Sequence, residues 1–175
     1  NSDVLASLVL RLKCPPQSMK EFEILYRLDV LFQLLQPFVP DLKSKCILSD
    51  DIYDYSYVSQ GKTTVQSIDD NEELEFTDNA FDVLGFAEDE KWNCYRITAA
   101  VMTFGEVTFK QKGRDDQAEV DGWEFPNKVA ELLGVNADEV MKAFVKPKIK
   151  VGTEWVTKGQ NVEQATNAVG GIARA

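Results

Sequence analysis

One stretch near the end of the chain decides which fold we predict: Lys146-Pro147-Lys148-Ile149-Lys150-Val151-Gly152-Thr153-Glu154-Trp155-Val156-Thr157-Lys158-Gly159-Gln160. β-Branched and aromatic side chains flank its central Gly-Thr pair. Glycine in the first central position is typical of a two-residue type II′ turn. The stretch therefore predicts a β-hairpin in which Lys150 lies opposite Trp155.

The two faces of this hairpin are expected to differ in character. Successive side chains on a strand point to opposite faces, so Lys148, Lys150 and Trp155 share one face. The residues predicted for the other face are Ile149, Val151, Glu154 and Val156, with Ile149 opposite Val156.

The charge of this hairpin is opposite to that of the chain. Residues 146–160 carry four lysines and one glutamate, a net +3, whereas the whole chain is −10. A basic hairpin with an exposed aromatic residue is suited to docking on an acidic partner. The alternative is a solvated hairpin whose lysines only protect an edge strand from pairing with other chains. Charge does not decide between these two interpretations.

Composition excludes several classes of function. The chain of 175 residues is 44% hydrophobic, enough for the core of one domain or of a piece of a larger one. The acidic balance argues against nucleic acid as a partner. Three cysteines (Cys14, Cys46 and Cys94) are too few for a disulfide framework and indicate a reducing, cytoplasmic compartment. The absence of histidine excludes Ser-His-Asp and Cys-His catalysis and histidine-containing zinc sites.

The first 40 residues follow a less regular pattern than the rest. Apolar runs at residues 4–12 and 22–35 are both shorter than the roughly 20 residues that a membrane span needs. The first run lacks the basic leader and cleavage site of a signal peptide, so no membrane partner is expected. The chain begins without methionine and ends inside a helical pattern, and we expect both ends to be cut from something longer.

Helical patterns dominate from residue 41 onward. Residues 41–48 read as a short helix, and residues 78–84 as a helix with Thr77 as its N-cap and Gly85 at its end. Residues 88–104 have apolar positions on two faces, with Ile97 on the second, so this helix is expected to be buried. The stretch from 69 to 90 has ten acidic residues but no EF-hand spacing, and is read as helix starts and a solvated face.

The C-terminal third adds a charged loop and more helices. Residues 110–124 are predicted to be a mobile loop suited to contacts. A helix over residues 129–133 ends at Gly134, and Asn136-x-x-Glu139 predicts a capped helix to about Val145. Asn161-x-x-Gln164 predicts another capped helix over residues 162–175. The predicted fold class is mainly α with a small β-hairpin.

A Gly61-Lys62-Thr63 triplet superficially suggests a phosphate-binding enzyme. A P-loop also needs glycine five positions before its second glycine, and that position is Ser56. Tyrosines crowd this region, whereas phosphate binding needs bare backbone. We therefore keep a phosphate-binding enzyme only as a minor alternative.

Several motifs occur in a fixed order along residues 39–175. They are Tyr53-Asp54-Tyr55 with Val58-Ser59-Gln60-Gly61, Ser67-Ile68-Asp69-Asp70, Thr77-Asp78-Asn79-Ala80-Phe81-Asp82-Val83-Leu84-Gly85-Phe86, Phe109-Lys110-Gln111-Lys112, Gln117-Ala118-Glu119-x-Asp121-Gly122, and Lys150-Val151-Gly152 with Val156-Thr157-Lys158-Gly159-Gln160-Asn161-Val162. In combination, these motifs resemble the motor domain of conventional, muscle-type (class II) myosin heavy chains. Residues 1–37 do not share the resemblance.

The resemblance implies which surfaces bind a partner. Residues 38–175 resemble the upper subdomain that borders the actin-binding cleft of the α/β P-loop myosin motor domain. The hairpin resembles the cardiomyopathy loop, a direct actin contact, and the residues implied are Lys146, Lys148, Lys150, Glu154, Trp155, Val156 and Lys158. The charged loop resembles loop four, a further contact near actin and tropomyosin, and the residues implied are Lys110, Lys112, Arg114, Asp115, Asp116 and Glu119. Many relatives carry arginine where this chain has Lys148, which lacks the planar bidentate fork.

The resemblance also implies what lies elsewhere in such a motor. ATP hydrolysis needs a phosphate cradle and Mg²⁺ ligands, and this sequence contains neither a P-loop nor a nucleotide-sensing switch motif. We expect no cofactor in this piece, ATP and Mg in the parent motor, and no catalysis by this piece on its own. The expected partners are the actin filament and the rest of the heavy chain, in the cytoskeleton, in a myosin filament or sarcomere if the protein is of muscle type. An acidic interaction module without motor activity is the alternative.

Overall fold

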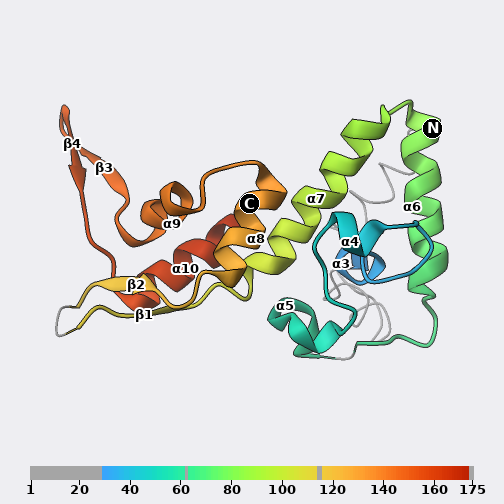
Figure 1. The fold of residues 1–175 in the computed structure, drawn as a ribbon, viewed down its shortest axis with the longest axis horizontal. Coiled ribbons are helices and arrows are strands. Elements are labelled where there is room, and N and C mark those ends of the chain that lie inside the picture. The colour runs from blue at the N-terminus through green and yellow to red at the C-terminus, as the bar shows by residue number, and fades with distance from the viewer. Residues whose placement is uncertain (1–28, 62, 114–115, 174–175) are drawn as a thin grey trace, which may run out of the picture. The chain divides into compact units, whose positions relative to one another are not determined.

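The computed structural model describes residues 29–61, 63–113 and 116–173 (Figure 1). The apolar run at residues 4–12, and the first half of the run with helical spacing at 22–35, lie outside the described residues. The chain divides into two compact units. The first unit comprises residues up to Asp54 together with Val58–Tyr95, and the second comprises Tyr55–Tyr57 and Arg96–Ala175.

The first unit is helical in its described part. Its elements are α3 (Asp29–Gln33), α4 (Leu42–Lys45), the 3-10 helix η1 (Ile52–Asp54), α6 (Asp70–Leu84) and the first part of α7 (Glu88–Phe104) (Figure 1). Helix α5 (Ser56–Ser59) is divided between the units, because its first two residues belong to the second unit. Leu34, Leu42 and Leu74 are fully buried and form the centre of the first unit. The short helix predicted at residues 41–48 is confirmed as α4, with narrower bounds.

Helix α6 begins earlier than the sequence pattern indicates. Its N-cap is Asp69, whose carboxylate accepts hydrogen bonds from the backbone N–H groups of Asn71 and Glu72. The N-cap predicted at Thr77 is wrong, because Thr77 lies inside the helix and its hydroxyl donates to the carbonyl of Glu73. A threonine that bonds back to the preceding turn imitates a cap in sequence. The predicted end is confirmed, since Gly85 has a left-handed conformation with φ 79°.

A polar cluster joins α6 to α7 inside the first unit. The Tyr95 hydroxyl donates to Asp78 at 2.9 Å, and the Lys91 ammonium lies 2.9 Å from Asp78 and 3.0 Å from Asp82. Burial, followed by the hydrogen bond to Asp78, raises the pKa of the Tyr95 phenol. Burial lowers the pKa of Lys91, but the hydrogen bonds to Asp78 and Asp82 outweigh it, so the pKa of Lys91 is raised.

The second unit packs helices against a small antiparallel sheet. Its elements are the end of α7, β1 (Phe109–Gln111), β2 (Ala118–Val120), α8 (Glu124–Leu133), α9 (Ala137–Val145), β3 (Lys148–Val151), β4 (Glu154–Thr157) and α10 (Val162–Ala173). Within the described residues, the strands form two separate two-stranded antiparallel sheets. The core includes Phe104, Val129, Met141, Phe144 and Val169. The prediction of a mainly α fold with a small hairpin is confirmed.

Both predicted caps in this unit are confirmed. Asn136 accepts a hydrogen bond from the N–H of Glu139 and begins α9. Asn161 and Gln164 exchange hydrogen bonds in both directions, which makes a reciprocal capping box for α10. These caps fix where the chain enters the two helices that flank the β3–β4 hairpin.

The prediction for the 88–104 helix is partly wrong. Tyr95, Ala99 and Met102 are buried as expected, but Ile97 on the second face is 55% exposed. Among the described residues, no helix is both long enough and apolar enough to cross a membrane.

We expect Tyr95→Phe to make stability less sensitive to alkaline pH. The unfolded chain releases the Tyr95 proton near the ordinary pKa of 10.0, while the folded chain keeps it, so stability falls as pH rises above that value. Above that pH, the Tyr95 phenol lowers the free energy of unfolding by about 1.4 kcal/mol per pH unit. The raised pKa of Lys91 acts in the same direction and remains in the variant. At neutral pH, Tyr95→Phe loses about 1–2 kcal/mol with its hydrogen bond.

The measurement is thermal unfolding followed by tryptophan fluorescence, because Trp92 lies edge-on to Tyr95 at 5.9 Å between ring centroids. The control is Tyr53→Phe, which alters a tyrosine that is 69% exposed. If the wild type and Tyr95→Phe lose stability equally at alkaline pH, the pH dependence does not come from Tyr95.

Candidate partner-binding site

The β3–β4 hairpin, called here the basic hairpin, has the predicted register. Lys150 pairs with Trp155 and Ile149 with Val156, as the position of Gly152 requires. Gly152 has φ 64°. Among the described non-glycine residues, only Asp41 and Ile47 have positive φ, so the φ of Thr153 is negative. Positive φ at the first central residue alone is the mark of a type II′ turn and excludes type I′.

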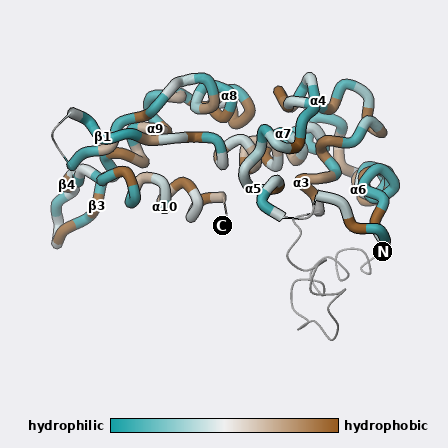
Figure 2. Tube along the Cα trace, turned by 90° about the horizontal axis from the view of Figure 1, so that it is seen from below, coloured by the Kyte–Doolittle hydropathy of each residue, from teal (hydrophilic) through white to brown (hydrophobic). Residues whose placement is uncertain are grey.

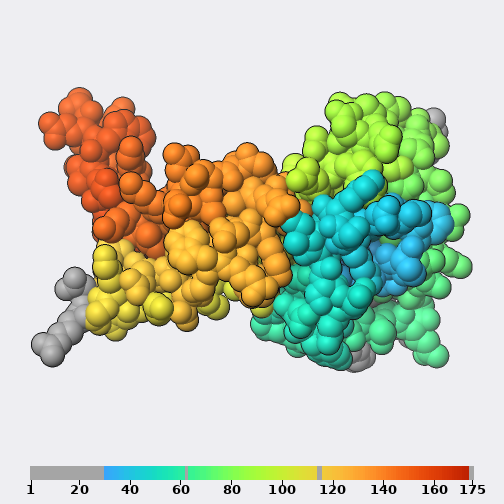
Figure 3. Space-filling model, viewed as in Figure 1, coloured from blue at the N-terminus to red at the C-terminus, as the bar shows by residue number. Residues whose placement is uncertain are grey.

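The basic hairpin stands away from the helices of its own unit. All residues of β3 and β4 are exposed, and the space-filling view shows the hairpin as a projection (Figure 3). Hydrophilic and hydrophobic residues alternate along β3 (Figure 2). Trp155 is 68% exposed, and Ile149, Val151 and Val156 are also exposed. An exposed cluster of large apolar side chains marks an interaction surface.

The lysines of the basic hairpin are available to a partner. Lys148 and Lys150 are exposed on the face that carries Trp155. In the part of the chain that the structure describes, no carboxylate forms an ion pair with Lys146, Lys148, Lys150 or Lys158. Glu154 lies next to the turn on the opposite face. The site therefore combines unneutralised positive charge with an exposed indole ring, an arrangement that can bind an acidic surface.

The second predicted contact segment is more ordered than expected. The prediction of a loop over residues 110–124 is wrong in part, because β1 and β2 pair there, with Lys110 opposite Glu119. We call this β1–β2 element the charged hairpin. Lys110 forms an ion pair with Asp121 at 3.1 Å. Alternation of apolar and charged residues, Phe109 buried and Lys110 exposed, is the signal that sequence reasoning missed.

The remaining predicted residues of this segment lie near its tip. Lys112 and Asp116 are exposed, and Glu119 is half-buried. Arg114 and Asp115 lie outside the described residues. Near the tip, Lys112 and Asp116 are therefore the described charged residues that are exposed and lie outside the paired strands.

The base of the basic hairpin meets the loop end of the charged hairpin. The N–H of Ala118 in β2 donates to the carbonyl of Gln160 at 2.8 Å, just after β4. The side chain of Gln117 reaches the carbonyls of Val145 and Gln160 at 3.0 and 3.2 Å. Sequence reasoning predicted the basic hairpin and a separate loop, and it missed the role of Gln117, because a long-range side-chain contact leaves no periodic signal.

The phosphate-binding alternative finds no support in the structure. Gly61 follows helix α5 rather than a strand, and the next helix begins only at Asp70, whereas a P-loop joins a strand directly to a helix. Thr63 and Thr64 line a hollow of about 470 Å³ together with the carboxylates Asp50, Asp51 and Asp70. Lys62 lies outside the described residues.

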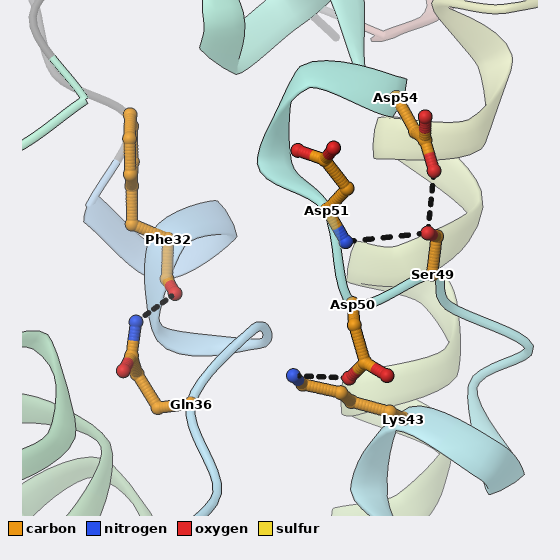
Figure 4. A network of polar contacts seen from close by, with 7 residues as sticks. All are labelled: Phe32, Gln36, Lys43, Ser49, Asp50, Asp51 and Asp54. Atoms are coloured by element: carbon orange, nitrogen blue, oxygen red, sulfur yellow. Dashed lines mark hydrogen bonds and ion pairs between the residues drawn. The ribbon is translucent and has the colours of Figure 1, made fainter.

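The polar network beside this hollow is already engaged in local contacts. Lys43 pairs with Asp50 at 2.7 Å, and Ser49 lies between Asp51 and Asp54 (Figure 4). A phosphate in this hollow would face three carboxylates, so like charges disfavour it. Among the described residues, no group of three acidic, cysteine or histidine side chains is placed to hold a metal ion.

Comparison with known families identifies the class of protein. The family model for the myosin head (motor domain) matches residues 19–175. The chain therefore belongs to the myosin head family and carries part of a myosin motor domain. The match begins at residue 19, ahead of the resemblance read from the sequence, which begins at about Val39.

We expect Gly152→Val to destabilise the basic hairpin, because a β-branched residue is strained at φ 64°. The cost is about 1–2 kcal/mol, with a smaller cost for Gly152→Asn. The measurement is amide hydrogen exchange of residues 148–157. The control is Gly61→Val, since Gly61 lacks a positive φ and a Cβ there meets open space. Unchanged exchange in Gly152→Val would show that the turn does not need glycine.

Proposed function

We propose that this chain supplies part of the actin-binding face of an actin-based, ATP-driven motor of the conventional, muscle-type class. The observation that carries the proposal is the basic hairpin, which projects an exposed Trp155 beside Lys148 and Lys150 on an otherwise acidic chain. Membership of the myosin head family makes actin the partner to expect.

The physical basis of this proposal is charge and packing together. Lys148 and Lys150 attract an acidic filament and raise the encounter rate, an effect that weakens with salt. Trp155 contributes a large apolar area that is removed from water on binding. The charges therefore steer association, and the indole ring mainly slows dissociation.

The charged hairpin is proposed as a second, weaker contact. Its exposed Lys112 and Asp116 are able to meet a partner of either charge at the tip. Lys110 is already paired with Asp121, so we assign it a smaller contribution to partner binding than the sequence pattern indicates. Exposed ion pairs contribute only roughly 0–1 kcal/mol each.

We further propose that ATP and Mg²⁺ are bound by other parts of the parent motor. The sequence has no P-loop motif, and Gly61 is not placed between a strand and a helix. The rest of the heavy chain is then the permanent partner of this piece, and the cytoskeleton is its location.

The alternative function is an acidic interaction module without motor activity. Actin binding that is coupled to nucleotide state separates the motor from this alternative.

We expect the double charge reversal Lys148→Glu with Lys150→Glu to weaken actin binding in the intact motor domain. Each exposed lysine is worth roughly 0.2–1 kcal/mol, and reversal adds repulsion to the lost attraction. The loss should be largest at low salt, because screening lengths shorten to about 8 Å at physiological ionic strength. The measurement is actin cosedimentation over a salt series.

Two further variants sharpen this test. Trp155→Ala should weaken binding with little change in salt slope, because it removes packing area and not charge. Lys128→Glu with Lys142→Glu makes the same charge change on helices α8 and α9, away from the basic hairpin. If the hairpin reversal and this control have equal effects, net charge alone explains the loss and the hairpin is not a specific contact.

We also expect the chain on its own neither to bind nor to hydrolyse ATP. The reason is that a P-loop requires a glycine where this chain has Ser56. Equilibrium dialysis with labelled ATP and a turnover assay on the purified chain measure this directly. ATP turnover that disappears on Lys62→Ala would contradict the expectation and revive the phosphate-binding alternative.

A further inference from the structure

The side-chain amide of Gln117 lies where the two hairpins of the second unit meet. Its Nε2 atom donates to three backbone carbonyls: Val145 at 3.0 Å, Ala118 at 3.1 Å and Gln160 at 3.2 Å. Val145 ends helix α9 just before the basic hairpin, and Gln160 follows that hairpin. A single side chain of the charged hairpin therefore bonds both ends of the chain segment that forms the basic hairpin.

The chemistry of this contact demands an amide. Three carbonyl oxygens surround Nε2, and only a group with hydrogens to donate is compatible with them. The two amide hydrogens are shared among the three acceptors. A side chain of similar length without donors, such as methionine, would leave these carbonyls without that partner.

Gly159 makes room for this amide. A Cβ atom added at Gly159 would collide with Gln117 Oε1 and lie 3.1 Å from its Cδ atom. Gly159 has no positive φ, so its backbone conformation does not require glycine. The need for glycine at this position comes from the close approach of Gln117.

Backbone hydrogen bonds complete the junction. Gln160 N–H donates to Val145 O at 2.9 Å, and Lys158 N–H donates to Pro147 O at 3.0 Å, closing the base of the basic hairpin. The N–H of Lys112 donates to the carbonyl of Gln117 at 2.7 Å, which closes the tip of the charged hairpin. Since the strands of the basic hairpin are exposed along their length, its direction depends on this base.

We propose that Gln117, seated against Gly159, is a positioning residue that fixes the basic hairpin relative to the charged hairpin, so that both meet actin as one preorganised surface. This inference rests on the proposed actin-binding function. Ordering a flexible element at an interface lowers affinity by the free energy spent on ordering it. Loss of the Gln117 contact is therefore expected to weaken actin binding roughly two- to tenfold.

The test uses a motor domain that contains this chain. Gln117→Met removes the donors without changing charge, and Gly159→Ala displaces the amide. Both are expected to lower actin affinity without altering the salt slope, because no charge has changed. Basal ATP turnover without actin should stay unchanged. Gln66→Met is the control, since it makes the same replacement at an exposed position in the first unit.

A double-variant cycle separates positioning from general damage. If Gly159→Ala acts only by displacing Gln117, it should have no further effect once Gln117 is replaced by alanine. Hydrogen exchange over residues 146–160 provides a readout that does not depend on actin. We expect faster exchange at Lys158 and Gln160 in Gln117→Met and unchanged exchange in Gln66→Met.

Each outcome decides the proposal. Faster exchange with weaker actin binding, an unchanged salt slope and a non-additive cycle supports it. Unchanged exchange, or additive effects of the two alanine replacements, overturns the contact between Gln117 and Gly159 itself. Faster exchange with unchanged actin affinity overturns the positioning role. In that last case, the Lys148 and Lys150 reversal shows whether the hairpin binds actin at all, so failure of the proposed function is recognised separately.

Discussion

The carbonyl groups of Val145 and Gln160 lie at the point where helix α9 ends and helix α10 is about to begin. Both residues are half-buried, and hydrogen bonds to their carbonyls come from Gln160 N–H, Ala118 N–H and the Gln117 amide. These bonds tie the charged hairpin to helix α9, the basic hairpin and helix α10, which follow one another in the chain. The exposed hairpin is able to project only because its base is tied in this way.

The helices on either side supply the rigidity of that base. Met141 and Phe144 on α9 and Val169 on α10 are buried in one apolar core with Phe109 and Ala118 of the charged hairpin. Burial of these side chains stabilises the unit by the hydrophobic effect. The basic hairpin adds nothing to that core, since its apolar residues are exposed. The second unit thus separates the residues that stabilise it from those proposed to bind a partner.

Structural features that depend on a few neighbouring residues could be predicted from the sequence, and features that depend on tertiary contacts could not. Gly152 predicted the turn and thereby the whole register of the basic hairpin, and Asn136 and Asn161 predicted their helix starts. The error at Thr77 arose because a mid-helix hydroxyl bonded to Glu73 looks like a cap in sequence. The contact of Gln117 with Gln160 spans more than forty residues and depends on tertiary packing, so no pattern in the sequence indicated it.

The central claim is that the basic hairpin is an actin contact held in place by the charged hairpin. A cryo-electron-microscopy structure of a motor domain containing this chain, bound to an actin filament without nucleotide, tests it most directly. The account predicts density for Trp155 and Lys150 against the actin surface, with the Gln117 side chain still bonded at the base of the hairpin. A bound motor in which the hairpin points into solvent would contradict the account.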